Sequence, residues 1–280
     1  RSKGKLKEGA ALSSSTGERS ARTSKEILFR PPVLKESNLA LFFPLGEEEN
    51  ATTVQDWSIH GLTGIVTGTV GRYPGFTGSA FRFNASANTK ITVPNHRVMR
   101  MASNGRYTAN IRMRHEVGSN HWTGPFARGG NNYKLSLGNS HNTNPYIHHR
   151  FRMGSNGNAG VTDAYGISPE IWTMVTLTNQ GNPGVAKSYI NGALIQSTTV
   201  NDTIWIEQER DLYLGTNENG NTDWFKGSLQ NFRLYNVAFT DAEVSSLYSS
   251  AAGESGAVVI STDSLIPVNA GVALSIQPSF

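Results

Sequence analysis

Apolar and polar residues alternate along much of this chain, in short segments separated by glycine, asparagine and proline. The segments are rich in β-branched and aromatic residues and have the lengths typical of strands. The clearest ones are 39–45, 79–85, 89–95, 107–115, 133–139, 146–153, 172–179, 186–197, 211–217 and 227–236. Within 186–197, Asn191 and Gly192 supply the positive φ angles of a two-residue hairpin turn. This pattern predicts an all-β fold, an antiparallel β-sandwich.

One segment near the end of the domain has helical rather than strand periodicity. Thr240 followed by Glu243 forms a capping box, and Val244, Leu247 and Tyr248 then fall on one helical face. We therefore expect one short C-terminal helix that closes the sandwich.

Alternation divides the segment 146–153, YIHHRFRM, into two faces. The inward face would hold Ile147, His149, Phe151 and Met153. The outward face would hold Tyr146, His148, Arg150 and Arg152. Because the two histidines point to opposite faces, they are not expected to chelate one metal ion together.

The segment 107–115 divides in the same way. Its inward residues would be Tyr107, Ala109, Ile111 and Met113, and its outward residues Thr108, Asn110, Arg112 and Arg114. If both segments share a sheet, one face carries four guanidinium groups beside an imidazole and a phenol. Three interpretations of such a face stay open: a solvated surface, a contact with a neighbouring subunit, or a site for carboxylate, sulfate or sialyl groups.

A sugar-binding surface is also suggested by the stretch 119–134, which we read as a loop. It contributes Trp122, Asn131 and Asn132 next to a predicted strand. Aromatic faces and amides are the groups that neutral sugar rings require. Trp122 and Trp224 would lie on a rim of the sandwich or plug its end.

Charge and composition set the ends of the chain apart from its centre. Of 25 Lys/Arg and 21 Asp/Glu, residues 1–36 hold nine Lys/Arg and four Glu, so this Ser-rich arm carries +5 and the rest −1. The arm is either a flexible tail or a segment that orders against neighbouring subunits or nucleic acid. Residues 250–280 form a linker and two strand-like runs, which pair with their own domain or with a partner.

Four motifs in order resemble laminin G-like domains of the concanavalin A-like lectin/glucanase superfamily. They are LALFFPLGEEENATTVQDWSIHG, GSAFRFNASANTKITVPN, WTMVTLTNQGNPGVAKSYINGALI and WFKGSLQNFRLYNVAFTDAEVSSLY, and the resemblance that they carry extends over residues 38–249. The resemblance implies a jelly-roll sandwich over 37–249 whose concave face or rim binds sugars or proteins. It also implies that Trp172, which opens one family strand, packs in the core.

The resemblance further implies a structural calcium, but several acidic positions of the family pattern differ here. Gln230 and Asn231 stand where the family has an acidic pair, and Asn84 replaces another acid. Calcium prefers carboxylate oxygens. We therefore expect no cofactor, and would place any calcium near Asp56, Asn84 and Asp223.

These features favour a non-enzymatic, lectin-like binding or attachment domain. The paired-carboxylate strand that glycosidases of this fold use is missing, and the chain has no cysteine for a disulfide, a thiol nucleophile or a cysteine-bound zinc. The arm and tail suggest a surface subunit of a homo-oligomeric assembly such as a virion or phage particle. A secreted adhesion protein and a glycoside hydrolase or polysaccharide lyase are the alternatives. We expect an extracellular or virion-surface location and no membrane span.

Overall fold

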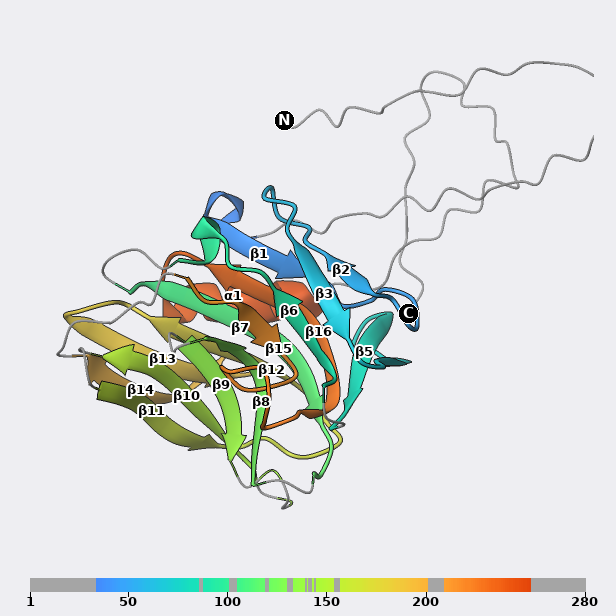
Figure 1. The fold of residues 1–280 in the computed structure, drawn as a ribbon. Coiled ribbons are helices and arrows are strands. Elements are labelled where there is room, and N and C mark those ends of the chain that lie inside the picture. Colours follow the sequence, from blue (N-terminus) through green and yellow to red (C-terminus); the bar gives the residue numbers. More distant parts are fainter. Residues whose placement is uncertain are drawn as a thin grey trace, which may run out of the picture. The chain divides into compact units, whose positions relative to one another are not determined.

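The structure is a computed structural model that describes residues 34–252, except 86–87, 101–104, 119–120, 130–132, 139, 141–142, 144, 154–156 and 201–208. For residues 152–153, 157–164 and 251–252 it describes the backbone alone. Two antiparallel sheets pack face to face as a sandwich (Figure 1). The predicted arm and C-terminal extension lie almost wholly outside the described residues, so their boundaries stay predictions.

Each sheet has eight strands in the described part of the chain. Sheet A has the order β14 (Ala193–Val200), β13 (Gly184–Ile190), β12 (Trp172–Asn179), β7 (Tyr107–His115), β16 (Lys226–Tyr235), β5 (Ser79–Asn84) and β4 (Gly71–Pro74), and β1 (Leu39–Phe43) also pairs with β16. Sheet B has the order β11 (Gly157–Tyr165), β10 (Tyr146–Met153), β9 (Tyr133–Gly138), β8 (Trp122–Arg128), β15 (Leu212–Leu214), β6 (Lys90–Val93), β3 (Thr63–Thr67) and β2 (Thr53–Gln55). The helical elements are η1 (Glu36–Asn38), η2 (Arg97–Met99) and α1 (Asp241–Ala252).

The core between the sheets is built from the residues that alternation places inward. The four inward residues of β7 are at most 1% exposed, and Ile147 of β10 joins the same cluster. His149 is fully buried beside them: its Nε2 lies 2.6 Å from the Tyr107 hydroxyl and its Nδ1 3.4 Å from Ser188 Oγ. Burial lowers the pKa of His149 to about 3, and the neighbouring His148 adds to the effect. His149 is therefore a neutral core residue.

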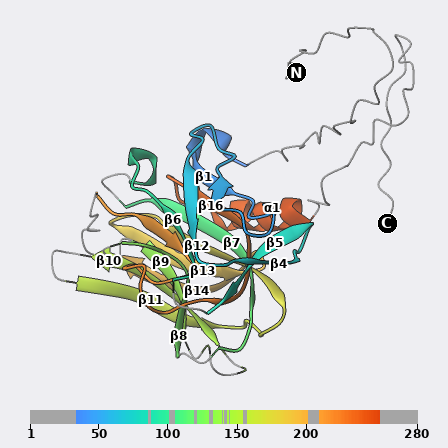
Figure 2. The same ribbon diagram turned by 45° about the vertical axis from the view of Figure 1, so that its right-hand side comes forward.

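Helix α1 begins with the predicted capping box. The backbone N–H of Thr240 donates to Glu243 Oε2 at 2.8 Å, and the N–H of Glu243 donates to Thr240 Oγ1 at 3.3 Å. Val244 and Leu247 are buried in a cluster with Tyr189 of sheet A. The helix therefore covers part of the outer face of sheet A (Figure 2).

The predicted strands are present, and the hairpin turn has φ angles of 49° at Asn191 and 80° at Gly192. Five strands were not predicted, namely β2, β3, β4, β8 and β11. No helix in the described part of the chain is long and apolar enough to cross a membrane.

Two placements of tryptophan were wrong. Trp122 belongs to strand β8 rather than to a loop. Trp172 is half-buried rather than in the core, because its register opposite Arg114 puts it on the outer face of sheet A.

Candidate functional site

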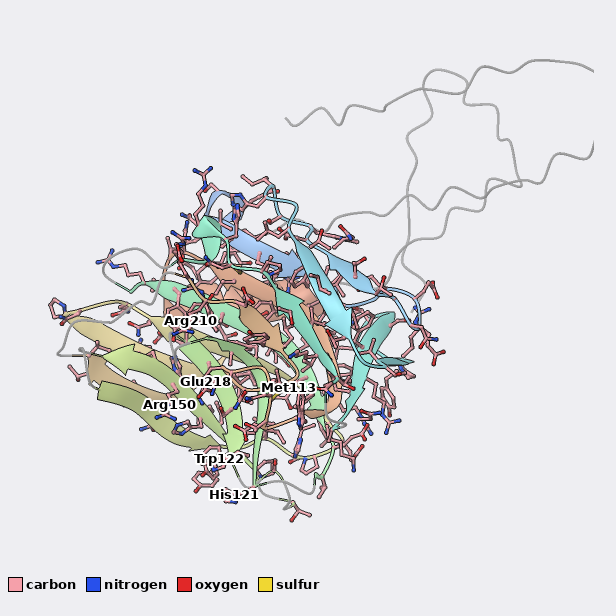
Figure 3. All side chains as sticks on the ribbon, viewed as in Figure 1. Met113, His121, Trp122, Arg150, Arg210 and Glu218 are labelled. Atoms are coloured by element: carbon pink, nitrogen blue, oxygen red, sulfur yellow. The ribbon has the colours of Figure 1, made fainter. Side chains whose placement is uncertain are left out.

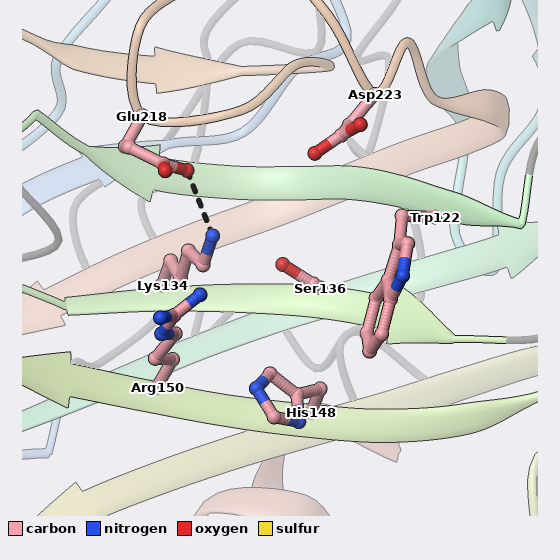
Figure 4. Close-up of a pocket in the computed structure, with 7 residues that line it drawn as sticks. All are labelled: Trp122, Lys134, Ser136, His148, Arg150, Glu218 and Asp223. Atoms are coloured by element: carbon pink, nitrogen blue, oxygen red, sulfur yellow. Dashed lines mark hydrogen bonds and ion pairs between the residues drawn. The ribbon is translucent and has the colours of Figure 1, made fainter. Parts of the chain in front are cut away.

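A pocket of about 490 Å³ lies on the outer face of sheet B, and seven side chains line it (Figure 4). They are Trp122 from β8, Lys134 and Ser136 from β9, His148 and Arg150 from β10, and Glu218 and Asp223 from the segment between β15 and β16. Figure 3 shows Trp122, Arg150 and Glu218 on this side of the sandwich. Three adjacent strands and one loop therefore build the site.

The floor of the pocket follows from strand alternation. Tyr133, Leu135 and Leu137 of β9 are fully buried in the core, so Lys134 and Ser136 between them face outward. In β10, His148 lies opposite Ser136 and Arg150 lies opposite Lys134. The pairing of two strands thus sets four polar side chains in a small rectangle.

An aromatic group borders one end of this floor. Trp122, Gly138 and Tyr146 lie in register across β8, β9 and β10, and Tyr165 of β11 continues the row. Because Gly138 has no side chain, the Tyr146 ring lies over it. Tyr146 meets Trp122 edge-on with centroids 5.8 Å apart, and His148 lies 5.2 Å from the same indole.

Charged groups occupy the other end. Lys134 Nζ donates to Glu218 Oε2 at 2.8 Å, and both side chains are largely buried, 7% and 16% exposed. Burial works to raise the pKa of Glu218, but the hydrogen bond from Lys134 and the charges of Lys134 and Arg150 outweigh it, so the pKa is lowered. Burial raises the pKa of Asp223; the charge of Lys134 opposes this shift and that of Glu218 adds to it.

The loop that carries Glu218 and Asp223 is held by hydrogen bonds within the loop and by one from strand β6. Asn217 Oδ1 accepts from the backbone N–H groups of Asn219 at 3.1 Å and Asn221 at 3.3 Å. Lys90 Nζ donates to the Gly220 carbonyl at 2.6 Å. These contacts fix the rim of the pocket before any ligand arrives.

The outward arginines predicted for segments 107–115 and 146–153 do not share a face. Arg150 lies on the outer face of sheet B, whereas Arg112 and Arg114 lie on the outer face of sheet A, on the opposite side of the sandwich. Arg112 is 2% exposed and its guanidinium lies 3.8 Å from the centroid of the Phe76 ring. A shared four-arginine face is therefore excluded, because β7 and β10 belong to different sheets.

Arg114 takes part in an ion-pair network on sheet A. It contacts Glu116 at 3.2 Å and also pairs with Glu170, and its guanidinium lies 4.5 Å from the Tyr73 ring. Arg82 reaches the same Glu116 carboxylate with two hydrogen bonds of 2.8 and 2.9 Å. Arg112 and Arg114 thus both have structural contacts within the domain.

The remaining predicted ligand-binding residues lie outside what the structure describes. Asn131 and Asn132 belong to the undescribed positions, and of Arg152 the backbone alone is described. Their proposed contact with a ligand stays a prediction.

The three positions suggested for calcium do not form one site. Asp56 is buried and accepts four hydrogen bonds, from the backbone N–H groups of Phe42, Ser58 and Leu62 and from the Ser58 hydroxyl, at 2.5–3.1 Å. Phe42 pairs with Arg233 and Asn84 pairs with Lys226 in the same strand β16. Seven residues of strand put Asp56 and Asn84 roughly 20 Å apart.

The third position, Asp223, instead lines the pocket on sheet B. Among the described residues, no three His, Asp or Glu side chains gather as a metal site would require. Gln230, at a family acid position, uses its amide to hold the turn before β5: its Oε1 accepts from the Phe76 N–H at 3.0 Å, and its Nε2 donates to the Ser79 carbonyl at 2.9 Å. This amide has a structural role at that position.

Sequence reasoning missed Lys134, Ser136 and Glu218. The alternation of segment 133–139 was sufficient to place Lys134 and Ser136 outward, next to the outward residues of 146–153. Glu218 lacks such a signal, because the path of its loop over β9 depends on tertiary contacts.

The fold and the site together define a jelly-roll sandwich with an aromatic and polar pocket on one sheet. The chain belongs to the concanavalin A-like lectin/glucanases superfamily, whose model matches residues 85–245. No curated protein sequence matches this chain.

Solved structures show the same fold. The binding domain of Paraclostridial Mosquitocidal Protein 1 is 20% identical, with a TM-score of 0.58 over 77% of this chain and 53% of that one. The binding domain of Botulinum neurotoxin DC in complex with rat synaptotagmin II is 17% identical, with a TM-score of 0.61 over 77% and 52%.

A third structure is that of botulinum neurotoxin type C, whose cell entry is dependent upon interaction with two ganglioside molecules. It is 16% identical, with a TM-score of 0.60 over 77% of this chain and 51% of that one. This chain thus covers about half the length of each of these structures, and identities this low show the fold alone.

Proposed function

We propose that this chain is a non-enzymatic, lectin-like binding domain that takes a saccharide in the pocket on sheet B. The observation that carries the proposal is the half-buried indole of Trp122, which packs edge-on against the buried Tyr146 ring and lines the pocket directly beside a floor of hydrogen-bonding side chains. A sugar ring has an apolar face and a rim of hydroxyls, so it needs both kinds of surface.

Each group of the pocket has a role in this arrangement. The indole of Trp122 stacks on the ring face, and the Ser136 hydroxyl and His148 imidazole bind ring hydroxyls. Asp223 accepts a further hydroxyl hydrogen. Two of the toxin structures similar to this chain are binding domains, one of them in complex with synaptotagmin II. The third belongs to a toxin whose cell entry is dependent upon interaction with gangliosides. These similarities support a binding role.

The test is a glycan array that holds neutral and acidic oligosaccharides, probed with the full chain. We expect saturable binding that Trp122→Ala weakens about tenfold or more, because stacking on an aromatic side chain is lost. Trp172→Ala is the matched control, since Trp172 is also half-buried but lies on sheet A. Absence of any signal, or equal loss in both variants, would contradict the proposal.

A second candidate function is glycoside cleavage, which one observation favours. Glu218 and Asp223 line the same pocket, and their pKa values are shifted in opposite directions. Glycosidases use one ionised and one protonated carboxyl group in this way. Release of reducing ends from β-glucans, alginates or galactans, abolished in Asp223→Asn, would support this candidate over pure binding.

We also propose that the domain is an exposed subunit of a larger assembly, outside cells or on a virion surface. The support is the sequence of the ends, a basic arm of residues 1–36 and a strand-like extension of residues 250–280. Light scattering tests it: a monodisperse monomer that is unchanged by deletion of both ends would contradict the assembly role.

A further inference from the structure

The charged end of the pocket has more positive than negative groups. Lys134 and Arg150 both act on the single carboxylate of Glu218, and Lys134 makes the direct 2.8 Å contact. Within the described residues Arg150 makes no ion pair or hydrogen bond, and it is half-buried rather than extended into solvent. Among the described side chains at this end, positive charges thus outnumber negative ones by one.

The acidic residue Asp223 does not cancel this charge directly. Figure 4 shows Asp223 on the side of the pocket nearer Trp122, with Arg150 at the opposite end beside Lys134. Burial and the neighbouring Glu218 both disfavour the charged form of Asp223. The site is therefore polarised, with a cation at one end and an aromatic face at the other.

We propose that Arg150 binds the carboxylate of an acidic sugar whose ring stacks on Trp122, which makes this pocket a site for uronic- or sialic-acid-type saccharides. The inference rests on the proposed saccharide binding and goes further by naming the class of sugar and its orientation. A guanidinium group suits this task because its planar fork matches the two oxygens of a carboxylate.

Lys134 is a poor alternative for the same role. Its ammonium already donates to Glu218, and its side chain is 7% exposed, so a ligand would have to displace an existing ion pair. Arg150 is close enough to the Glu218 carboxylate for the two charges to interact, but it is not held by a direct contact with Glu218 as Lys134 is.

The experiment compares matched ligands on the full chain. Oligosaccharides that contain glucuronic, galacturonic or sialic acid are each tested beside their carboxyl-reduced forms, in which –COO⁻ has become –CH₂OH with the ring unchanged. A sulfated neutral oligosaccharide forms a third arm and distinguishes a carboxylate site from a general anion site. The variants are Arg150→Gln, Trp122→Ala and, as a control for net charge, Arg72→Gln on sheet A.

We expect the wild type to bind one of the acidic oligosaccharides at least about tenfold more tightly than it binds the carboxyl-reduced form of the same oligosaccharide. This factor corresponds to one charge-assisted hydrogen bond. Arg150→Gln removes this preference and leaves binding of the reduced form unchanged, whereas Arg72→Gln keeps the preference. Trp122→Ala weakens binding of both forms.

The outcomes separate the two proposals. Equal affinity for the acidic and reduced members, or a preference that survives Arg150→Gln, overturns the inference while saccharide binding stands. Tighter binding of the sulfated arm than of every carboxylate also overturns it, in favour of a sulfate site. If no saccharide of either form binds, the proposed function itself fails.

Discussion

The glycine at position 138 provides a stringent test of the site because it can be examined without a ligand. A Cβ at this position would collide with the ring of Tyr146, which lies over Gly138 and meets Trp122 edge-on at 5.8 Å. In Gly138→Ala the Tyr146 ring must therefore move away from its place beside the indole.

The expected cost has two parts. Overpacking a filled site costs about 1–3 kcal/mol, and loss of the aromatic pair costs about 0.5–1.5 kcal/mol. Gly138→Ala should therefore lower the free energy of unfolding by about 1.5–4.5 kcal/mol. Gly71→Ala is the matched control, since Gly71 is also a strand glycine but its Cβ would meet Arg82 at an ordinary 3.9 Å. That variant should be neutral or slightly stabilised.

The assay is urea unfolding of the wild type and both variants, together with Gly138→Ala in a Tyr146→Ala background. If the ring collision is the cause, the substitution at Gly138 costs little once the ring is absent. The reasoning is refuted if Gly138→Ala and Gly71→Ala differ by less than about 0.5 kcal/mol, the usual scatter of neutral substitutions.

Three further outcomes follow from buried polar groups. Asp56→Ala should lose about 2–4 kcal/mol in urea unfolding, since it leaves three backbone N–H groups without their acceptor, and the wild type should melt at the same temperature in EDTA and in calcium. Glu218→Gln should cost about 1.5–3 kcal/mol at pH 7; because the folded pKa of Glu218 is lowered, this difference should shrink as pH falls below about 4, and Lys134→Met should show the same trend. The folded pKa of His149, about 3, lies below the ordinary value of about 6.5, so the unfolded chain takes up a proton first as pH falls, and the wild type should lose about 2 kcal/mol more than His149→Gln between pH 7 and pH 5. A pH profile of stability that is parallel in wild type and His149→Gln would contradict the assignment.

Much of the sandwich is predictable because both faces of its strands obey alternation. The inward residues of 107–115 are in the core, Ile147, His149 and Phe151 of 146–153 are buried, and the capping box at Thr240 marks the start of α1. Strand β8 was not predicted because Gly124 and Pro125 interrupt the alternation of apolar and polar residues. The pairing of β8 with β9 shifts register at the same place, between Thr123 and Phe126. Short local signals therefore identify regular strands better than irregular ones.

The candidate site was predictable in part. Tyr146, His148 and Arg150 face outward as alternation requires, and Trp122 joins them from β8. Which strands share a sheet is a property of the topology, so the sequence offered no ground for separating Arg112 and Arg114 from Arg150. The loop carrying Glu218 lies over the floor through contacts between residues far apart in sequence.

The measurement that tests the central claim most directly follows the indole N–H signal of Trp122 in a ¹H–¹⁵N spectrum, assigned with Trp122→Phe. A saccharide selected on the array is titrated into the full chain. The account predicts that the Trp122 signal shifts and saturates with the binding curve, while the signal of Trp172 on sheet A stays in place. Saturable binding that moves Trp172 and leaves Trp122 unchanged would contradict a saccharide site on sheet B.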